Sequence, residues 1–76
     1  MEWRERIVAD PKVMVGKPVI KGSRITVEFI IDLLANSWSH EQILDNYPGI
    51  VEDDIISCLE YAHEMIKDIK EYPILT

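Results

Sequence analysis

The chain contains few of the residues and patterns that mark several common protein classes. Its 76 residues include a single cysteine, Cys58, so no internal disulfide can form, and we expect a reducing, cytoplasmic setting. No apolar run approaches the roughly 18 residues that a membrane span needs, so we expect no membrane partner. Basic residues are scarce after Arg24, where only Lys67 and Lys70 stand against eleven carboxylates.

The charges divide the chain into two unlike parts. The formal net charge is -6, but residues 1–24 hold six cations against three carboxylates and carry +3, whereas residues 25–76 carry -9. Two surfaces of opposite sign indicate two different kinds of partner. Hydrophobic residues make up 47% of the chain, enough for the core of one small domain, residues 1–76, with some left for an interface.

Residues 1–25 are predicted to form a β-rich basic arm. Turns are indicated at 10–11 and 16–18, because proline restricts both its own backbone and that of the preceding residue. Residues 6–8 and 19–21 fit two short paired strands. The arm is rich in turns as well as in cations.

A three-helix unit is predicted over residues 26–71. Thr26 is the expected N-cap of the first helix, and Asn36 is expected to end it in a left-handed conformation. Ser39 and Gln42 match a capping box at the start of a short second helix. The third helix is expected to begin near Val51 or Glu52.

The third helix carries an apolar stripe that is longer than the first two helices can cover. About ten residues in the first helix span roughly 15 Å, while the third spans roughly 27 Å. The stripe comprises Ile55, Cys58, Leu59, Ala62, Met65, Ile66 and Ile69. The far end of the stripe and the tail, residues 72–76, are predicted to form an interface with a partner or with a second copy, most simply in a homodimer. The predicted interface residues are Met65, Ile66, Ile69, Tyr72, Ile74 and Leu75.

The expected fold class is therefore mainly α, a homeodomain-like helix-turn-helix of three helices preceded by a short N-terminal β-hairpin arm. Such folds commonly bind DNA through the third helix, but this one begins with Glu52, Asp53 and Asp54, which repel phosphates. Any contact with nucleic acid, or with an acidic toxin, is therefore expected from cations of the arm. The alternative is that these cations only form a solvated surface and bind no partner. These cations are Arg4, Arg6, Lys17, Lys21 and Arg24.

Catalysis, metal binding and cofactor binding are not expected. Glu60 and His63 have a spacing found in di-iron bundles, but such sites need further inward-facing carboxylates. Cys58 lies about 140° around the helix from His63, so the two do not form a nucleophile–base pair. Gly22 lacks the spacing of a phosphate-binding loop and is expected to serve a tight turn through a positive φ.

Three features follow one another along the chain: the run Gly-Lys-Pro-Val-Ile-Lys-Gly-Ser-Arg-Ile over residues 16–25, the apolar helix, and Tyr47-Pro48. Together they resemble a prokaryotic family of unknown function, the domain-of-unknown-function family number 433. The resemblance covers residues 6–66. It implies a homeodomain-like or winged-helix fold and an antitoxin role beside a PIN-like ribonuclease toxin. Two departures are Ser37, where the family often has glycine, and Val51, where it often has a capping threonine.

Two hypotheses follow for the function. In the first, the chain is a small DNA-binding antitoxin that represses its own operon through the basic arms and neutralises a PIN-like ribonuclease. The acidic helical half or the apolar tail would hold this toxin, or the basic arm would instead enter its acidic, metal-binding site. In the second, it is a protein-interaction adaptor that keeps the helical fold and does not bind DNA. The basic arm and the resemblance favour the first, and the acidic start of the third helix favours the second.

Overall fold

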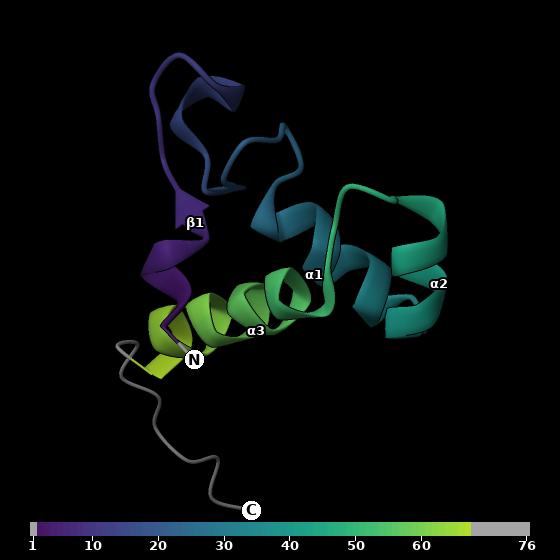
Figure 1. The fold of residues 1–76 in the computed structure, drawn as a ribbon. Helices are drawn as coiled ribbons and strands as arrows, with labels where there is room; N and C mark the ends of the chain where they lie inside the picture. Colours follow the sequence, from purple (N-terminus) through teal and green to yellow (C-terminus); the bar gives the residue numbers. More distant parts are fainter. Residues whose placement is uncertain (1, 68–76) are drawn as a thin grey trace, which may run out of the picture.

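Three α-helices and a small β-hairpin make up the fold in the computed structural model, which describes residues 2–67. Figure 1 shows the hairpin and its long connecting loop rising above the helices, with α3 running beneath α1. The mainly α class and the N-terminal antiparallel hairpin are confirmed. The helices are α1 (Val27–Ala35), α2 (His40–Asn46) and α3 (Glu52–Lys67).

The hairpin joins the arm to the core. Strands β1 (Ile7–Val8) and β2 (Val19–Ile20) pair antiparallel, with Ile7 opposite Ile20. Ile7, Val19 and Ile20 are buried, and Val8 faces outward. The two strands were predicted, but they hold two residues each. Most of the arm is turns and the 3₁₀ segments η1 (Trp3–Glu5) and η2 (Met14–Gly16), because its prolines and glycines favour turns over a long ladder.

The predicted starts of the first two helices are confirmed in atomic detail. The Thr26 hydroxyl accepts a hydrogen bond of 3.0 Å from the Phe29 amide at the start of α1. At α2, the Ser39 hydroxyl accepts from the Gln42 amide at 3.1 Å, and the Gln42 side chain accepts from the Ser39 amide at 2.8 Å. Both caps satisfy amides that a helix leaves unpaired in its first turn.

The end of α1 corrects one expectation. Asn36 is not left-handed, at φ -92°; the left-handed residue is Ser37, at φ 69°. The Trp38 amide donates to the Leu33 carbonyl at 3.0 Å and the Ser37 amide to the Leu34 carbonyl at 3.0 Å, the pattern of a Schellman motif. That motif places its left-handed residue one position beyond the cap, where glycine is usual.

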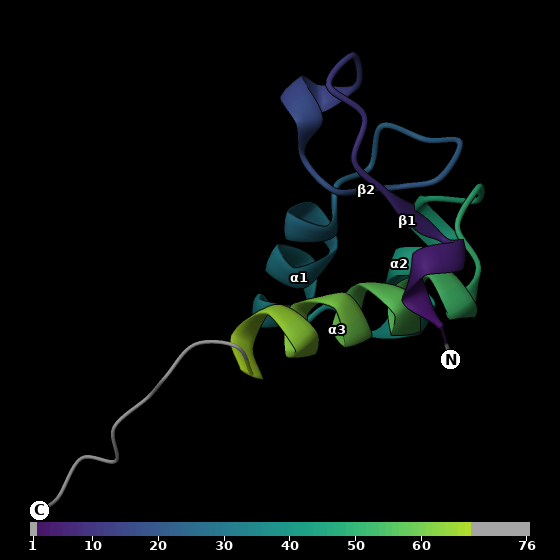
Figure 2. The same cartoon turned by 90° about the vertical axis from the view of Figure 1, so that its left-hand side faces the viewer.

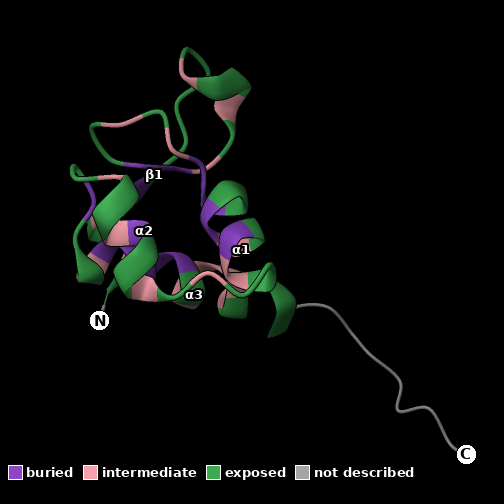
Figure 3. Ribbon diagram, turned by 90° about the vertical axis from the view of Figure 1, so that its right-hand side faces the viewer, coloured by how far each residue is buried: buried purple, intermediate pink, exposed green. Residues whose placement is uncertain are grey.

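The core lies where α1, α2 and the hairpin meet the first half of α3. Figure 3 shows the buried segments gathered on the facing sides of these elements. Ile30, Ile43, Ile55 and Cys58 are fully buried at the centre. Leu59, predicted to share the apolar stripe, is instead 40% exposed. Compared with the predicted apolar stripe, the buried side of α3 is shifted around the helix so that it includes two polar residues.

These two residues are Asp54 and Ser57, both buried on α3. Asp54 also supplies the cap that position 51 cannot, because its carboxylate accepts a hydrogen bond of 3.0 Å from the Val51 amide. This contact is the return half of a capping box. The start of α3 therefore has a side-chain partner despite Val51.

Candidate partner interface

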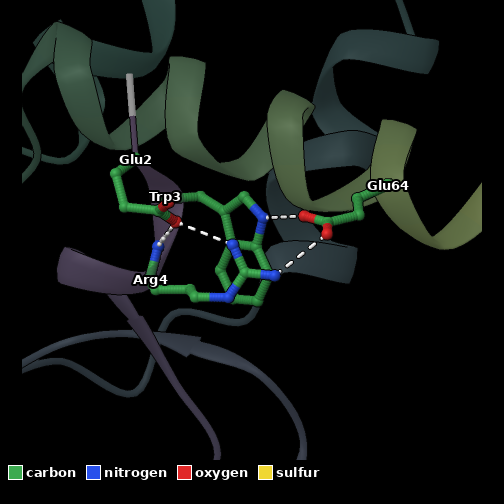
Figure 4. A network of polar contacts seen from close by, with 4 residues as sticks. All are labelled: Glu2, Trp3, Arg4 and Glu64. Atoms are coloured by element: carbon green, nitrogen blue, oxygen red, sulfur yellow. Dashed lines mark hydrogen bonds and ion pairs between the residues drawn. The ribbon is translucent and has the colours of Figure 1, made fainter.

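A strap of residues 2–6 runs along α3 and holds the first predicted site cation. Figure 4 shows Arg4 paired with Glu2 and Glu64, at 3.0 Å and 2.9 Å, while the Trp3 indole N–H donates to the same Glu64 carboxylate. The Arg4 guanidinium lies 4.5 Å from the Trp3 ring centroid, and Trp3 meets Tyr61 edge to face at 4.9 Å. Arg4 is thus engaged within the chain.

The strap also shifts the ionisation of its carboxylates. The Trp3 indole and then the Arg4 guanidinium hydrogen-bond to Glu64 and lower the pKa of that carboxyl. The same contact with Glu64 raises the pKa of Arg4. Both shifts favour the charged forms, so the strap is held most firmly when Glu64 is ionised.

Arg6 is committed to the acidic start of α3. Its guanidinium lies 3.1 Å from the Asp54 carboxylate and 3.5 Å from that of Asp53. The Asp54 side chain is only 9% exposed, so its charge needs this partner. The acidic cluster that opposes phosphate binding therefore serves, in part, to anchor the arm.

Lys17 has a weaker engagement. Its ammonium lies 3.1 Å from the Glu28 carboxylate, and both side chains are more than half exposed. Such surface pairs contribute about 0–1 kcal/mol, so Lys17 can exchange this partner at little cost.

Lys21 and Arg24 stand apart from the other three cations. Within residues 2–67, neither side chain makes an ion pair or hydrogen bond, and both residues are exposed. They flank a hydrogen-bonded turn, which we call the basic turn, in which Gly22 has φ 80°, as expected. The Ser23 hydroxyl secures the turn by donating to the Ile20 carbonyl at 2.8 Å and accepting from the Ile25 amide at 3.0 Å.

The second half of α3 is poorly covered, as the length comparison predicted. Ile55 and Cys58 are fully buried, whereas Met65 and Ile66 are 42% and 56% exposed. The remaining predicted interface residues lie outside the described part of the chain: Ile69, Tyr72, Ile74 and Leu75. Their role stays a prediction.

A groove lies between α1 and this half of α3. It has a volume of about 390 Å³, and its apolar walls are Pro18, Val27, Ile31, Tyr61 and Ala62. We call it the α1–α3 groove. Lys17, Thr26 and Glu28 complete its rim.

Comparison with known proteins assigns the chain to a family. Residues 7–62 match the family described as "Protein of unknown function (DUF433)". The chain belongs to this family. The match includes the hairpin, the turn that carries Lys21 and Arg24, the α1–α3 groove and most of α3. The strap of residues 2–6 and the exposed residues Met65 and Ile66 lie outside the matched range.

The chain is similar to one solved structure and, over a short stretch, to one further sequence. A crystal structure of a DUF433 member protein from Anabaena variabilis superposes with a TM-score of 0.77 at 24% identity, over 83% of this chain; the chain spans 62% of that protein. This likeness concerns the fold alone. An uncharacterised protein of Archaeoglobus fulgidus is 75% identical over 24 residues, 32% of this chain and 67% of its own length.

One feature of the arm was missed by the sequence reasoning. Met14 and Val15 form an apolar tip on the loop between the strands, with φ 49° and 58°, and Val15 is 94% exposed. A left-handed backbone costs a residue that carries a Cβ about 1–2 kcal/mol, most clearly a β-branched one. The signal was an apolar run, Val13 to Val15, inside a turn-rich segment.

The described residues contain few groups suited to other chemistry. Among residues 2–67, no three His, Cys, Asp or Glu side chains are grouped so as to hold a metal ion. Cys58 is fully buried, and burial raises the pKa of its thiol to about 12. In the same range, no helix is long and apolar enough to cross a membrane.

Proposed function

We propose that this protein is a cytoplasmic protein-interaction adaptor, the antitoxin of a type II pair, that neutralises a PIN-like ribonuclease. The observation that supports this most is the state of the cations. Arg4 and Arg6 are engaged by α3, whereas Lys21 and Arg24 are exposed on the basic turn. Two cations held on a turn suit insertion into an acidic, metal-binding nuclease site, and catalysis then belongs to the partner.

The magnitudes favour a protein partner over DNA. Each phosphate contact contributes about -0.9 to the slope of log affinity against log salt, so two cations per copy account for about -2. DNA-binding proteins with six to ten such contacts have far more electrostatic attraction. The acidic first turn of α3, Glu52 to Asp54, adds repulsion at the place where a recognition helix meets the groove.

Self-association completes the proposal. The apolar stripe of α3 is about half exposed to solvent at Met65 and Ile66, beside the α1–α3 groove. A second copy of the chain would cover this surface, and two-fold dimers are the commonest oligomers. The dimer would then present two basic turns.

A second candidate function is repression of the protein's own operon. It is favoured by the exposed cations alone, because a dimer would offer Lys21 and Arg24 twice. In this case DNA binding would be weak and strongly dependent on salt.

Titration calorimetry against a PIN-like ribonuclease encoded beside this gene tests the first candidate. Changing Lys21 and Arg24 together to Ala is expected to weaken binding at least tenfold, whereas the control Lys17→Ala, which loses only the Glu28 pair, should change it little. Binding that the double variant leaves intact would refute this placement of the site.

The second candidate has its own assay. A fluorescence-anisotropy titration with the upstream promoter at roughly 50 and 200 mM salt should give a slope of about -4 for a dimer if the basic turns bind DNA. No change of anisotropy at low salt would exclude the repressor.

A further inference from the structure

The apolar tip of the arm, Met14 and Val15, is a costly arrangement for an isolated chain. Both residues have left-handed backbones, and Val15 is almost fully exposed. The loop is nevertheless well held, because the Val13 amide donates to the Asp10 carbonyl at 2.8 Å and the Gly16 amide to the Val13 carbonyl at 3.1 Å. Gly or Asn would serve this turn better, so stability of the fold does not account for Val15.

The α1–α3 groove offers matching chemistry on the same side of the molecule. Figures 2 and 3, seen from opposite sides, both place η2, α1 and the C-terminal end of α3 along one edge. The groove is walled by apolar side chains, and α1 carries the exposed acids Glu28 and Asp32 beside it. The loop that bears the tip carries the exposed cation Lys12.

The charge of the two regions is complementary. Residues 10–24 carry a formal net charge of +3, whereas residues 27–67, which hold the three helices, carry -8. A second copy that approaches with its arm toward the helices is therefore attracted, and one that approaches with arm toward arm is repelled.

From these observations we propose that the Met14–Val15 tip of each chain inserts into the α1–α3 groove of a second copy. This inference rests on the self-association proposed above and names the contact that produces it. Because tip and groove lie along one edge, a two-fold axis beside that edge makes both contacts at once and closes the dimer. The exposed Met65 and Ile66 then lie next to the seated tip.

Sedimentation equilibrium of the full chain, over roughly 1 µM to 1 mM, tests the proposal. Val15→Gly is expected to weaken the dimer about tenfold, because it removes a buried apolar anchor. It should also raise the melting temperature of the monomer by about 5 °C, because glycine accepts φ 58° without strain. Ala62→Glu, in the groove, should weaken the dimer as strongly.

Leu59→Gln is the matched control, since Leu59 is an exposed apolar residue of α3 that lies outside the groove. A cross-link gives a second readout: chains with Val15→Cys mixed with chains with Ala62→Cys should form a disulfide between copies, while the buried Cys58 stays inert. A dimer that Val15→Gly leaves unchanged would overturn the inference and leave self-association standing. A monomer at every concentration would overturn both, even if Val15 proved to bind a different protein.

Discussion

Truncation of Asp54 is the change that most directly tests how the arm is attached to α3. Its carboxylate accepts the Val51 amide at 3.0 Å and pairs with Arg6 at 3.1 Å, with a side chain only 9% exposed. Loss of a capping hydrogen bond costs about 1 kcal/mol. Loss of a charge-assisted hydrogen bond costs about 1.5–3 kcal/mol, and the lower end applies because Arg6 is 37% exposed. Asp54→Ala should therefore cost about 2.5 kcal/mol.

That loss is large for a domain of this size. Typical values of about 0.05–0.15 kcal/mol per residue give a total stability of roughly 4–11 kcal/mol. The melting temperature should fall by about 10–20 °C. Asp54→Asn keeps an acceptor for the Val51 amide and loses the charge, so about half of the effect is expected.

Urea unfolding followed by the fluorescence of Trp3 and Trp38 measures these changes. Asp53→Ala is the control, because Asp53 is half exposed and lies 3.5 Å from Arg6; its cost should stay within about 0.5 kcal/mol. If Asp54→Ala cost no more than this control, the anchoring role would be wrong. A double-mutant cycle with Arg6→Leu and Asp54→Asn separates the free energy of the ion pair from that of the cap.

Three further predictions concern local features. Ser37→Gly should raise the unfolding free energy by about 1 kcal/mol in the same urea assay, because glycine relieves the left-handed backbone; a loss of stability would contradict the Schellman assignment. The folded-state pKa of Glu64 is lowered, so its stabilising contribution is full above pH 4.5 and disappears as the pH falls through the lowered pKa. Glu64→Gln should therefore reduce the fall of the unfolding free energy between about pH 5 and pH 3, and an unchanged dependence of stability on pH would refute the role of Glu64. Cys58, with its pKa raised to about 12, should react with a thiol reagent at about pH 8 only after unfolding, and rapid reaction of the folded protein would show that the thiol is accessible.

Helix boundaries were the most predictable part of the fold. The caps at Thr26 and Ser39 join residues three positions apart, so their side chains and backbone amides meet whatever the rest of the chain does. The end of α1 was predicted correctly, but the left-handed residue was placed one position too early, because asparagine accepts a left-handed backbone more readily than serine. The geometry of the Schellman motif nevertheless put Ser37 at that position.

The face of α3 was less predictable. Hydrophobic periodicity centred the stripe on Ile55, Leu59 and Ala62, but the buried side includes Asp54 and Ser57 and leaves Leu59 exposed. Periodicity counts only apolar side chains, and so it misses a polar group that is buried because a distant cation neutralises it.

The candidate site divides in the same way. The sequence alone determined the N-caps of α1 and α2, the surplus of cations in residues 1–24 and the uncovered end of α3, since each depends on composition or on neighbours within a few turns. Only the tertiary structure decided which cations are engaged, because Arg4 meets Glu64 across 60 positions and Arg6 meets Asp54 across 48. It also decided the backbone of Val15, where the closure of the loop between the two strands overrides the preference of a β-branched residue.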